Sequence, residues 1–385
     1  MPIFSENEMS RRLIRFRARM GAERIDAALL HTADHVFYLS GVALLSGWGR
    51  PMWSVVTETA SIICGAAIHE ENIRAHGSVD ELLLYNDDEE PTRKCIALCS
   101  SVIARNGGLT PRIGIEEAAM PYGTRKALEE SIPGAVFVDV SPWLEEMRFI
   151  KTAEELSLLK FASDLAKLGA DAFIEALDDN VTELAVAAHA LAAVDKAMGA
   201  LSSDAVTSSA VYAQFGGNTM IPHQHPTGRR LKRGDVVTLN IFPAVWGYSS
   251  ELIRTFVHGG PSERQRQILE VIDRSLDVGK GLLVPGAIMG DVNRGMNEVI
   301  ARHGFEGGIR CGNGHANGIM IGAAGREERG EVRAYNTNRF APGVVNTIEP
   351  GVYLPEIGGF RQSDLMVLTP TGAECLTDFP LRIGW

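Results

Sequence analysis

Apolar and polar positions alternate in different ways before and after residue 148 of this chain. In the first part, short apolar runs are separated by stretches whose apolar residues recur at helical spacing. The runs predict strands at residues 26–30, 54–64, 81–85, 112–115 and 135–140, and the stretches between them predict helices at 92–105 and 122–131. An earlier helix should begin after Ser5, because Glu8 lies three residues on, as in a capping box. Strands that alternate with helices predict an α/β domain.

The second part groups its helices apart from its strands. Thr152 and Glu155 form another capping-box pattern at the start of a long amphipathic helix, and residues 182–198 predict a second, alanine-rich helix. Strands are predicted at 236–242, 252–257, 318–321, 344–349 and 365–368, and further helices at 262–282 and 289–303. This order indicates an α+β domain. We therefore expect an N-terminal domain at residues 1–148 and a C-terminal domain at residues 149–385.

The composition narrows the class of protein. Apolar residues make up 45% of the chain and charged residues 22%, which is typical of a globular protein, and no run of about 18 apolar residues predicts a membrane span. A formal net charge of −11 argues against a nucleic-acid partner. The five cysteines are scattered, and the first residues are polar rather than signal-like. A cytoplasmic protein with free thiols, without a membrane or nucleic-acid partner, is expected.

Glu349 and His315, both in the C-terminal part, are candidate ligand-binding residues. Glu349 follows an apolar strand and precedes Pro350, and a carboxylate at such a place is costly unless it is paired or hydrogen-bonded. Its role is either to bind a substrate or to form a structural ion pair, for which Arg361 is the available partner. His315 lies among glycines, where the backbone can approach a ligand closely.

A pair of histidines precedes the predicted strand at 236–242. His223 and His225 lie in the sequence Pro-His-Gln-His-Pro, and histidine is suited to proton transfer because its usual pKa lies near neutrality. A pair of histidines in a surface loop is the plainer interpretation. His223 is the preferred proton carrier, and His225 remains the alternative.

The whole chain resembles the creatinase and prolidase family, whose catalytic domain has the pita-bread fold. The resemblance is carried by residues 234–248, by Gly-His-Ala-Asn-Gly at 314–318, and by the spacing of 23 residues between Arg326 and Glu349. Segment 234–248 looks more like creatinase than like the metallopeptidase branch, because that branch has an aspartate where this chain has Asn240. The resemblance implies the metal-independent creatinase branch.

The same resemblance identifies the positions at which the metallopeptidase members hold two metal ions. In this chain these positions are Asn240, Glu251, His315, Glu349 and Ser363. A neutral amide and a hydroxyl replace two carboxylates, which leaves three residues able to bind a metal. A two-metal site is therefore not expected, although one weakly bound ion is conceivable, and no cofactor is predicted.

Substrate-binding residues also follow from the resemblance. Arg326 corresponds to an arginine that holds the substrate carboxylate, and Arg50 to one that enters the pocket from the partner subunit of a homodimer. Either arginine could instead be an exposed surface cation. Tyr248, His315, Asn240 and Ser363 are expected to line the pocket. A second guanidinium-binding glutamate of creatinase falls on Ile253 here, although Glu251 lies two residues away on the same face.

These observations predict a C–N hydrolase of creatinase type that acts on a small carboxylate-bearing amidine, guanidino or amide compound. His223 or His225 would move protons, and Glu349 and Glu251 would hold the nitrogen-rich group. Creatine itself is disfavoured, because Ser363 replaces a pocket histidine and small residues at 322–324 replace a bulky stretch. The alternatives are a metal-dependent Xaa-Pro peptidase and a binding module without activity.

Overall fold

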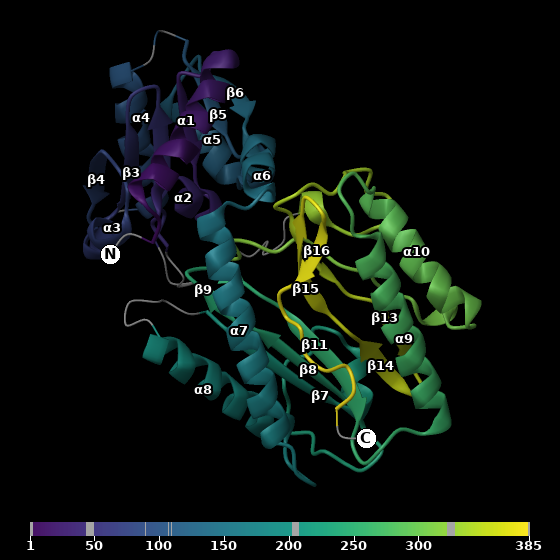
Figure 1. Ribbon diagram of the computed structural model, residues 1–385. Helices are drawn as coiled ribbons and strands as arrows, with labels where there is room; N and C mark the ends of the chain where they lie inside the picture. Colours follow the sequence, from purple (N-terminus) through teal and green to yellow (C-terminus); the bar gives the residue numbers. More distant parts are fainter. Residues whose placement is uncertain are drawn as a thin grey trace. The chain divides into compact units, whose positions relative to one another are not determined.

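The computed structural model describes residues 3–43, 50–88, 90–106, 108, 110–201, 208–321 and 328–383. The chain forms two compact units (Figure 1). The first comprises Met1–Arg148 with a short segment that starts at Ile321, and the second comprises Phe149–Met320 and the chain from Arg326 onward. Each unit is described separately.

The first unit is built on one six-stranded mixed sheet. Across the sheet the strands are β4 (Glu81–Tyr85), β3 (Ser61–Ala66), β2 (Trp53–Thr57), β1 (Ala27–Leu30), β5 (Arg112–Ile115) and β6 (Val136–Asp139). The pairs β1–β2 and β2–β3 are antiparallel, whereas β3–β4, β1–β5 and β5–β6 are parallel. Parallel neighbours need a crossover, and helices supply it here, which confirms the predicted α/β class.

Among the described residues, six α-helices accompany this sheet. They are α1 (Glu6–Ala22), α2 (Ala33–Ser40), α3 (Glu70–His76), α4 (Pro91–Asn106), α5 (Tyr122–Ser131) and α6 (Ser141–Phe149). Ser5 begins α1 as predicted, since its side chain accepts a hydrogen bond from the backbone N–H of Glu8. The buried face of α4, including Cys99 and Val102, packs with Leu29 and Val55 of the sheet into one apolar core.

The single strand predicted at 54–64 is wrong. The structure has two antiparallel strands, β2 and β3, joined by a turn at residues 58–60. The Thr57 backbone N–H donates to Ala60 O at 2.9 Å, and the Ala60 N–H donates to Thr57 Oγ1 at 3.0 Å. Three consecutive polar residues, Thr57, Glu58 and Thr59, interrupt the apolar run, and the Thr57 side chain closes the turn between the two strands.

Among the described residues, the second unit contains four long helices. They are α7 (Ala153–Glu175), α8 (Glu183–Leu201), α9 (Glu263–Leu282) and α10 (Met289–Arg302). The predicted capping box starts α7: the Thr152 hydroxyl accepts from the Glu155 N–H, and the Glu155 carboxylate accepts from the Thr152 N–H. At Gly169, α7 comes so close to α8 and to the sheet that an added Cβ would lie 2.9 Å from Ile241.

The described strands of the second unit form four small antiparallel sheets. The first contains β11 (Leu252–Val257), β8 (Val236–Phe242) and β7 (Ala210–Phe215), in that order. The others are β12 (Val345–Ile348), β15 (Asp364–Thr369) and β16 (Gly372–Cys375), then β13 (Gly351–Leu354) with β14 (Gly358–Arg361), and β9 (Ala244–Val245) with β10 (Tyr248–Ser249). Helices grouped beside antiparallel strands confirm the α+β class (Figure 1).

A strand was also expected at 318–321, and the structure contradicts it. Ile319 forms only an isolated bridge with Tyr248, and Ala316 forms another with Asn346. The Asn317 N–H donates to Val345 O, whereas the Met320 N–H donates to Gly247 O, so the segment passes from one neighbour to another. It therefore forms no continuous ladder.

Short 3-10 helices complete the described elements of the two units. They are η1 (Ala67–His69), η2 (Glu117–Ala119), η3 (Gly216–Met220), η4 (Glu306–Gly308) and η5 (Glu328–Gly330).

Across the described ranges, no helix combines the length and the apolar character that a membrane crossing requires.

Candidate active site

Two carboxylates and a histidine from three different segments meet in the second unit. Glu251 directly precedes β11, Glu349 directly follows β12, and His315 lies in the loop that follows η4. His315 Nε2 lies 3.3 Å from Glu251 Oε2 and 3.9 Å from Glu349 Oε2. All three side chains are buried. The structure thus brings together three of the residues that the sequence nominated.

The backbone before His315 requires glycine. Gly314 has φ +146°, and an added Cβ would lie 2.1 Å from the carbonyl oxygen of Thr347. Two hydrogen bonds exploit this close approach: the His315 N–H donates to Thr347 Oγ1 at 2.9 Å, and the Thr347 N–H donates to His315 O at 2.8 Å. His315 is therefore held against the strand that leads to Glu349.

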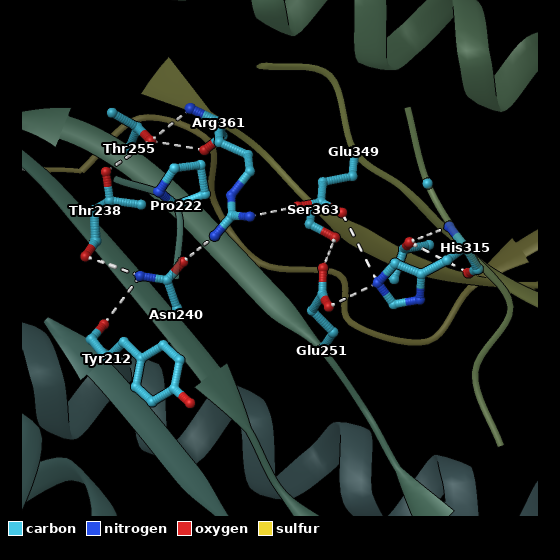
Figure 2. Close-up of polar contacts among 12 residues, drawn as sticks. Tyr212, Pro222, Thr238, Asn240, Glu251, Thr255, His315, Glu349, Arg361 and Ser363 are labelled. Atoms are coloured by element: carbon cyan, nitrogen blue, oxygen red, sulfur yellow. Dashed lines mark hydrogen bonds and ion pairs between the residues drawn. The ribbon is translucent and has the colours of Figure 1, made fainter. Parts of the chain in front are cut away.

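Arg361, at the end of β14, joins Glu349 to Asn240 (Figure 2). Its Nη1 lies 2.8 Å from Glu349 Oε1, and its Nη2 donates to Asn240 Oδ1 at 2.6 Å. The amide of Asn240 donates in turn to Tyr212 O at 3.0 Å and to Thr238 O at 3.3 Å. Asn240 is therefore engaged with protein groups, is fully buried and lies outside the cavity lining.

Ser363 holds the other carboxylate. Its hydroxyl donates to Glu251 Oε1 at 2.7 Å, and Figure 2 shows Glu251 between Ser363 and His315. Ser363 has no exposed surface and lies outside the cavity lining, so the structure places it behind Glu251, and its contact with substrate stays a prediction. Arg254, almost completely buried, donates to Ser363 O at 2.9 Å and pairs with Asp364 at 2.7 Å, which fixes the backbone here.

Opposite influences act on the pKa of Glu251. Burial raises it, because a charged carboxylate loses its hydration. The hydrogen bond and charge of His315, the charge of Arg361 and the hydroxyl of Ser363 lower it, and the net pKa lies below the usual value of a glutamate. For Arg361, burial lowers the pKa, but nearby Tyr353, Glu349 and Glu251 raise it, and the net change is upward. Both groups are therefore charged at neutral pH.

A cavity of about 280 Å³ opens beside these groups. Its polar lining includes Glu251, His315, Glu349, Arg361, Ser249 and His223. Its apolar and aromatic lining includes Ala210, Tyr212, Pro222, Phe242, Ala244 and Met320. His223 belongs to this lining, whereas His225 does not: its ring packs on Tyr212, with centroids 4.7 Å apart.

Three other predicted residues lie elsewhere or cannot be placed. Tyr248 is fully buried, donates its hydroxyl hydrogen to Glu155 at 2.8 Å and lies outside the cavity lining. Arg50 belongs to the first unit, where its half-exposed side chain pairs with Asp87 at 2.6 Å. Arg326 and the small residues at 322–324 lie outside the described residues.

The sequence interpretation missed most of the cavity wall. Tyr212, Phe242 and Met320 line it, and Arg361 had been considered only as the ion-pair partner of Glu349. One signal was available for Phe242. It lies two residues after Asn240 on the same strand, and alternate residues of a strand share a face.

Comparisons with known proteins identify the family. Residues 157–370 match the profile of metallopeptidase family M24, and residues 12–150 match that of the creatinase/prolidase N-terminal domain. A creatinase from Bacillus sp. is 30% identical over 98% of this chain and 92% of its own length. The chain belongs to the M24 family. Its two-domain architecture is that of creatinases and prolidases, with a pita-bread C-terminal domain.

Peptidase relatives in the family are nearly as similar. An Xaa-Pro dipeptidase from Pyrococcus horikoshii is 26% identical over 96% of this chain and 97% of its own length. The solved prolidase structure from the same organism has a TM-score of 0.83 with 23% identity, over 96% of this chain and 99% of that one. The Xaa-Pro dipeptidase structure from Bacillus anthracis has a TM-score of 0.84 with 22% identity, over 97% and 99%. These structures support the fold, and the chain is a hydrolase of the M24 family.

The donor groups of this M24 member do not fit a two-metal centre. Asn240 directs its oxygen to Arg361 and its nitrogen to two backbone carbonyls, and Ser363 directs its hydroxyl to Glu251. Within the described part of the chain, only Glu251, His315 and Glu349 form a group able to hold a metal, with donor atoms within 4.8 Å of one another. Three such donors fit one ion at most.

Proposed function

We propose that this M24 member is a metal-independent, creatinase-like hydrolase. It would cleave a C–N bond in a small carboxylate-bearing amidine, guanidino or amide compound. The observation that carries this proposal is the engagement of Asn240 and Ser363, at two of the metal-ligand positions, with Arg361 and Glu251. The similarity to a creatinase along almost the whole chain supports it.

In this mechanism His223 is the proton carrier. Its position in the cavity lining lets its ring accept a proton from a water molecule as the water oxygen bonds to the amidine or amide carbon. The same proton then passes to the leaving nitrogen, and the C–N bond breaks. Water is consumed, and the products are the oxygen-bearing fragment and a free amine or ammonia.

The two carboxylates serve the nitrogen-rich group. Glu251 and Glu349 line the cavity, and carboxylate oxygens accept the N–H groups of an amidinium or guanidinium while stabilising its positive charge. Arg361 pairs with Glu349, and Ser363 donates to Glu251, so these two residues position the carboxylates that bind the substrate. Arg326, and Arg50 from a partner subunit, would anchor the substrate carboxylate.

Metal content and activity in chelator test the proposal together. The purified protein should contain less than stoichiometric Mn, Co or Zn by elemental analysis. Its turnover of a panel of guanidino, amidine and amide acids, followed by release of amine or ammonia, should be unchanged in EDTA. One or two ions per chain, together with loss of activity in EDTA that the ion restores, would overturn metal independence.

A second candidate function is a metal-dependent Xaa-Pro peptidase. It is favoured by the cluster of Glu251, His315 and Glu349 and by the dipeptidase relatives. These three residues would hold a single ion, which would polarise the peptide carbonyl. Manganese-dependent hydrolysis of Pro dipeptides, absent without the ion, would select this function. Lack of turnover in both panels, with binding of the same compounds, would indicate a binding module.

A further inference from the structure

One side of the cavity has no part in the proposed acid–base chemistry. Tyr212, Phe242, Pro222 and Met320 line it, and all four side chains are partly exposed. The rings of Tyr212 and Phe242 meet edge to face, with centroids 5.4 Å apart. In Figure 2, Tyr212 and Pro222 lie apart from the carboxylates of Glu349 and Glu251. The cavity therefore has an apolar wall and an acidic end.

Strand register fixes the wall beside the acidic end. Ala210 and Phe242 are cross-strand partners on β7 and β8, and Tyr212 faces Asn240 one pair further along. Side chains two residues apart on a strand share a face, so these four residues project to one side of the sheet. Leu252 of β11 pairs with Ile241, which sets Glu251 next to Phe242. A ligand held by Glu251 therefore contacts this wall.

Charge and size restrict what can occupy the cavity. Its described lining contains two carboxylates, Glu251 and Glu349, and two groups that already pair with them: Arg361 donates to Glu349 and Asn240, and His315 Nε2 lies 3.3 Å from Glu251. Carboxylate oxygens accept N–H groups, which a cation supplies and an anion such as a carboxylate does not, so this end of the cavity favours a cation. A cavity of about 280 Å³ lies just under the usual range of roughly 300–1,000 Å³, which suits a ligand of about one ring.

We infer that this site selects a small amidinium or guanidinium that carries a ring-sized apolar substituent, which packs on Tyr212 and Phe242. The inference rests on the proposed function, since it names the substrate class of that same site. Both rings would act through contact area and edge geometry rather than through proton transfer. They would thus set the specificity of the reaction.

Binding of simple cations to the full-length protein tests the inference without turnover. Benzamidinium, acetamidinium and benzoate would each be titrated into the protein by isothermal calorimetry. Benzamidinium should bind at least about tenfold more tightly than acetamidinium, because only its ring can be buried on the wall. It should also bind more tightly than benzoate, since an anion is repelled by the acidic end.

Two variants locate the preference. Phe242→Leu keeps an apolar core residue but removes the ring, and it should reduce the benzamidinium preference severalfold. Ala210→Leu fills the space in front of Phe242, and it should abolish benzamidinium binding while acetamidinium binding changes little. Tyr335→Ala, which removes a ring that is 77% exposed and absent from the cavity lining, is the matched control and should change neither. Circular dichroism and thermal melting would verify that each variant is folded.

The outcomes separate this inference from the proposed function. Equal affinity for benzamidinium and acetamidinium, or a preference that both variants retain, would overturn the apolar selection even if hydrolysis in chelator were demonstrated. Tighter binding of benzoate would overturn the choice of a cation. If the ring preference is found but no C–N bond is cleaved, the binding class stands and the hydrolase proposal fails.

Discussion

The hydroxyl of Ser363 donates a hydrogen bond of 2.7 Å to the carboxylate of Glu251. In the metallopeptidase members the position of Ser363 is expected to carry a carboxylate that binds metal, and two carboxylates so close would repel each other without a cation. A hydroxyl instead stabilises the charged form of Glu251. The substitution converts a position of metal binding into one that supports a single carboxylate.

Removing this hydroxyl gives the first prediction. Ser363→Ala should raise the pKa of Glu251, because burial then opposes its charge with one hydrogen bond fewer. If charged Glu251 binds the substrate cation, the acidic limb of the kcat/KM profile should move to higher pH, and KM at neutral pH should rise by about tenfold. Ser275→Ala, which removes a buried hydroxyl bonded to Met296 O, is the matched control. An unmoved acidic limb would contradict the role assigned to Ser363.

Arg326 is the subject of the second prediction, which rests on family resemblance alone. Arg326→Lys keeps the positive charge but loses the planar fork that binds a carboxylate through two bonds. KM for a carboxylate-bearing substrate should rise by more than about tenfold, with the melting temperature unchanged. Unchanged kinetics would show that Arg326 does not bind the substrate carboxylate.

The third prediction concerns a homodimer completed by Arg50. The pair that Arg50 forms with Asp87 is exposed, and such pairs contribute little stability, so the side chain can be redirected at small cost. Light scattering should show a dimer, and Arg50→Ala should lower kcat/KM by about tenfold while leaving the dimer intact. Arg74→Ala is the control, since Arg74 belongs to the same unit and forms an equally exposed pair with Glu70.

Mixing two impaired variants makes this test decisive. If Arg50 serves the neighbouring subunit, a heterodimer of Arg50→Ala and His223→Ala subunits contains one intact site. After subunit exchange, the mixture should recover about a quarter of the wild-type rate, because half of the dimers are mixed and each has one working site of two. A mixture no more active than its parts, or a fully active monomer, would rule out a shared site.

Local sequence patterns predicted most helices and strands. Contacts between residues far apart in the chain could not be predicted from the sequence. The predicted starts at Ser5 and Thr152 begin α1 and α7 because every hydrogen-bond partner of each cap lies within three residues. The bond between Arg361 and Asn240 joins residues 121 positions apart, and no short pattern encodes it. Tyr248 illustrates the same limit: it lies within the motif that identified the family, yet its hydroxyl bonds to Glu155 of α7, 93 positions earlier in the same unit.

The fourth prediction concerns how the buried carboxyl of Asp273 makes folding stability depend on pH. The side chain of Gln362 donates to this carboxyl at 3.2 Å. Burial raises the pKa of Asp273 to about 6, while Arg382 and Gln362 act in the opposite direction. Between pH 4 and 6 the folded state therefore holds a proton that the unfolded state has lost, so this group makes stability fall as pH rises. Asp273→Asn should remove that part of the slope, on the order of 2–3 kcal/mol, in melting experiments from pH 4 to 7. If the stability of the wild type and of the variant changes equally with pH over this range, the prediction is wrong.

The last prediction distinguishes the two histidines. His223 lines the cavity that contains Glu251 and Glu349, whereas His225 packs on Tyr212 and is absent from that lining. If no metal activates the water, as we propose, hydrolysis near neutral pH needs a general base, and His223 lines the cavity where one is needed. His223→Ala should lower kcat by about 10²–10⁴-fold, the usual contribution of general acid–base catalysis, and should remove the ascending limb of the pH–rate profile.

His225→Ala should keep both the limb and most of the rate, and its main effect should be on KM, because loss of the ring loosens Tyr212 in the cavity wall. Asn at each position serves as a second variant that keeps a polar side chain without a group that titrates near neutral pH. If His225→Ala loses the limb while His223→Ala retains it, the proton carrier is His225. If both variants keep the rate and the limb, neither histidine moves the proton, and a metal-free acid–base mechanism on this site fails.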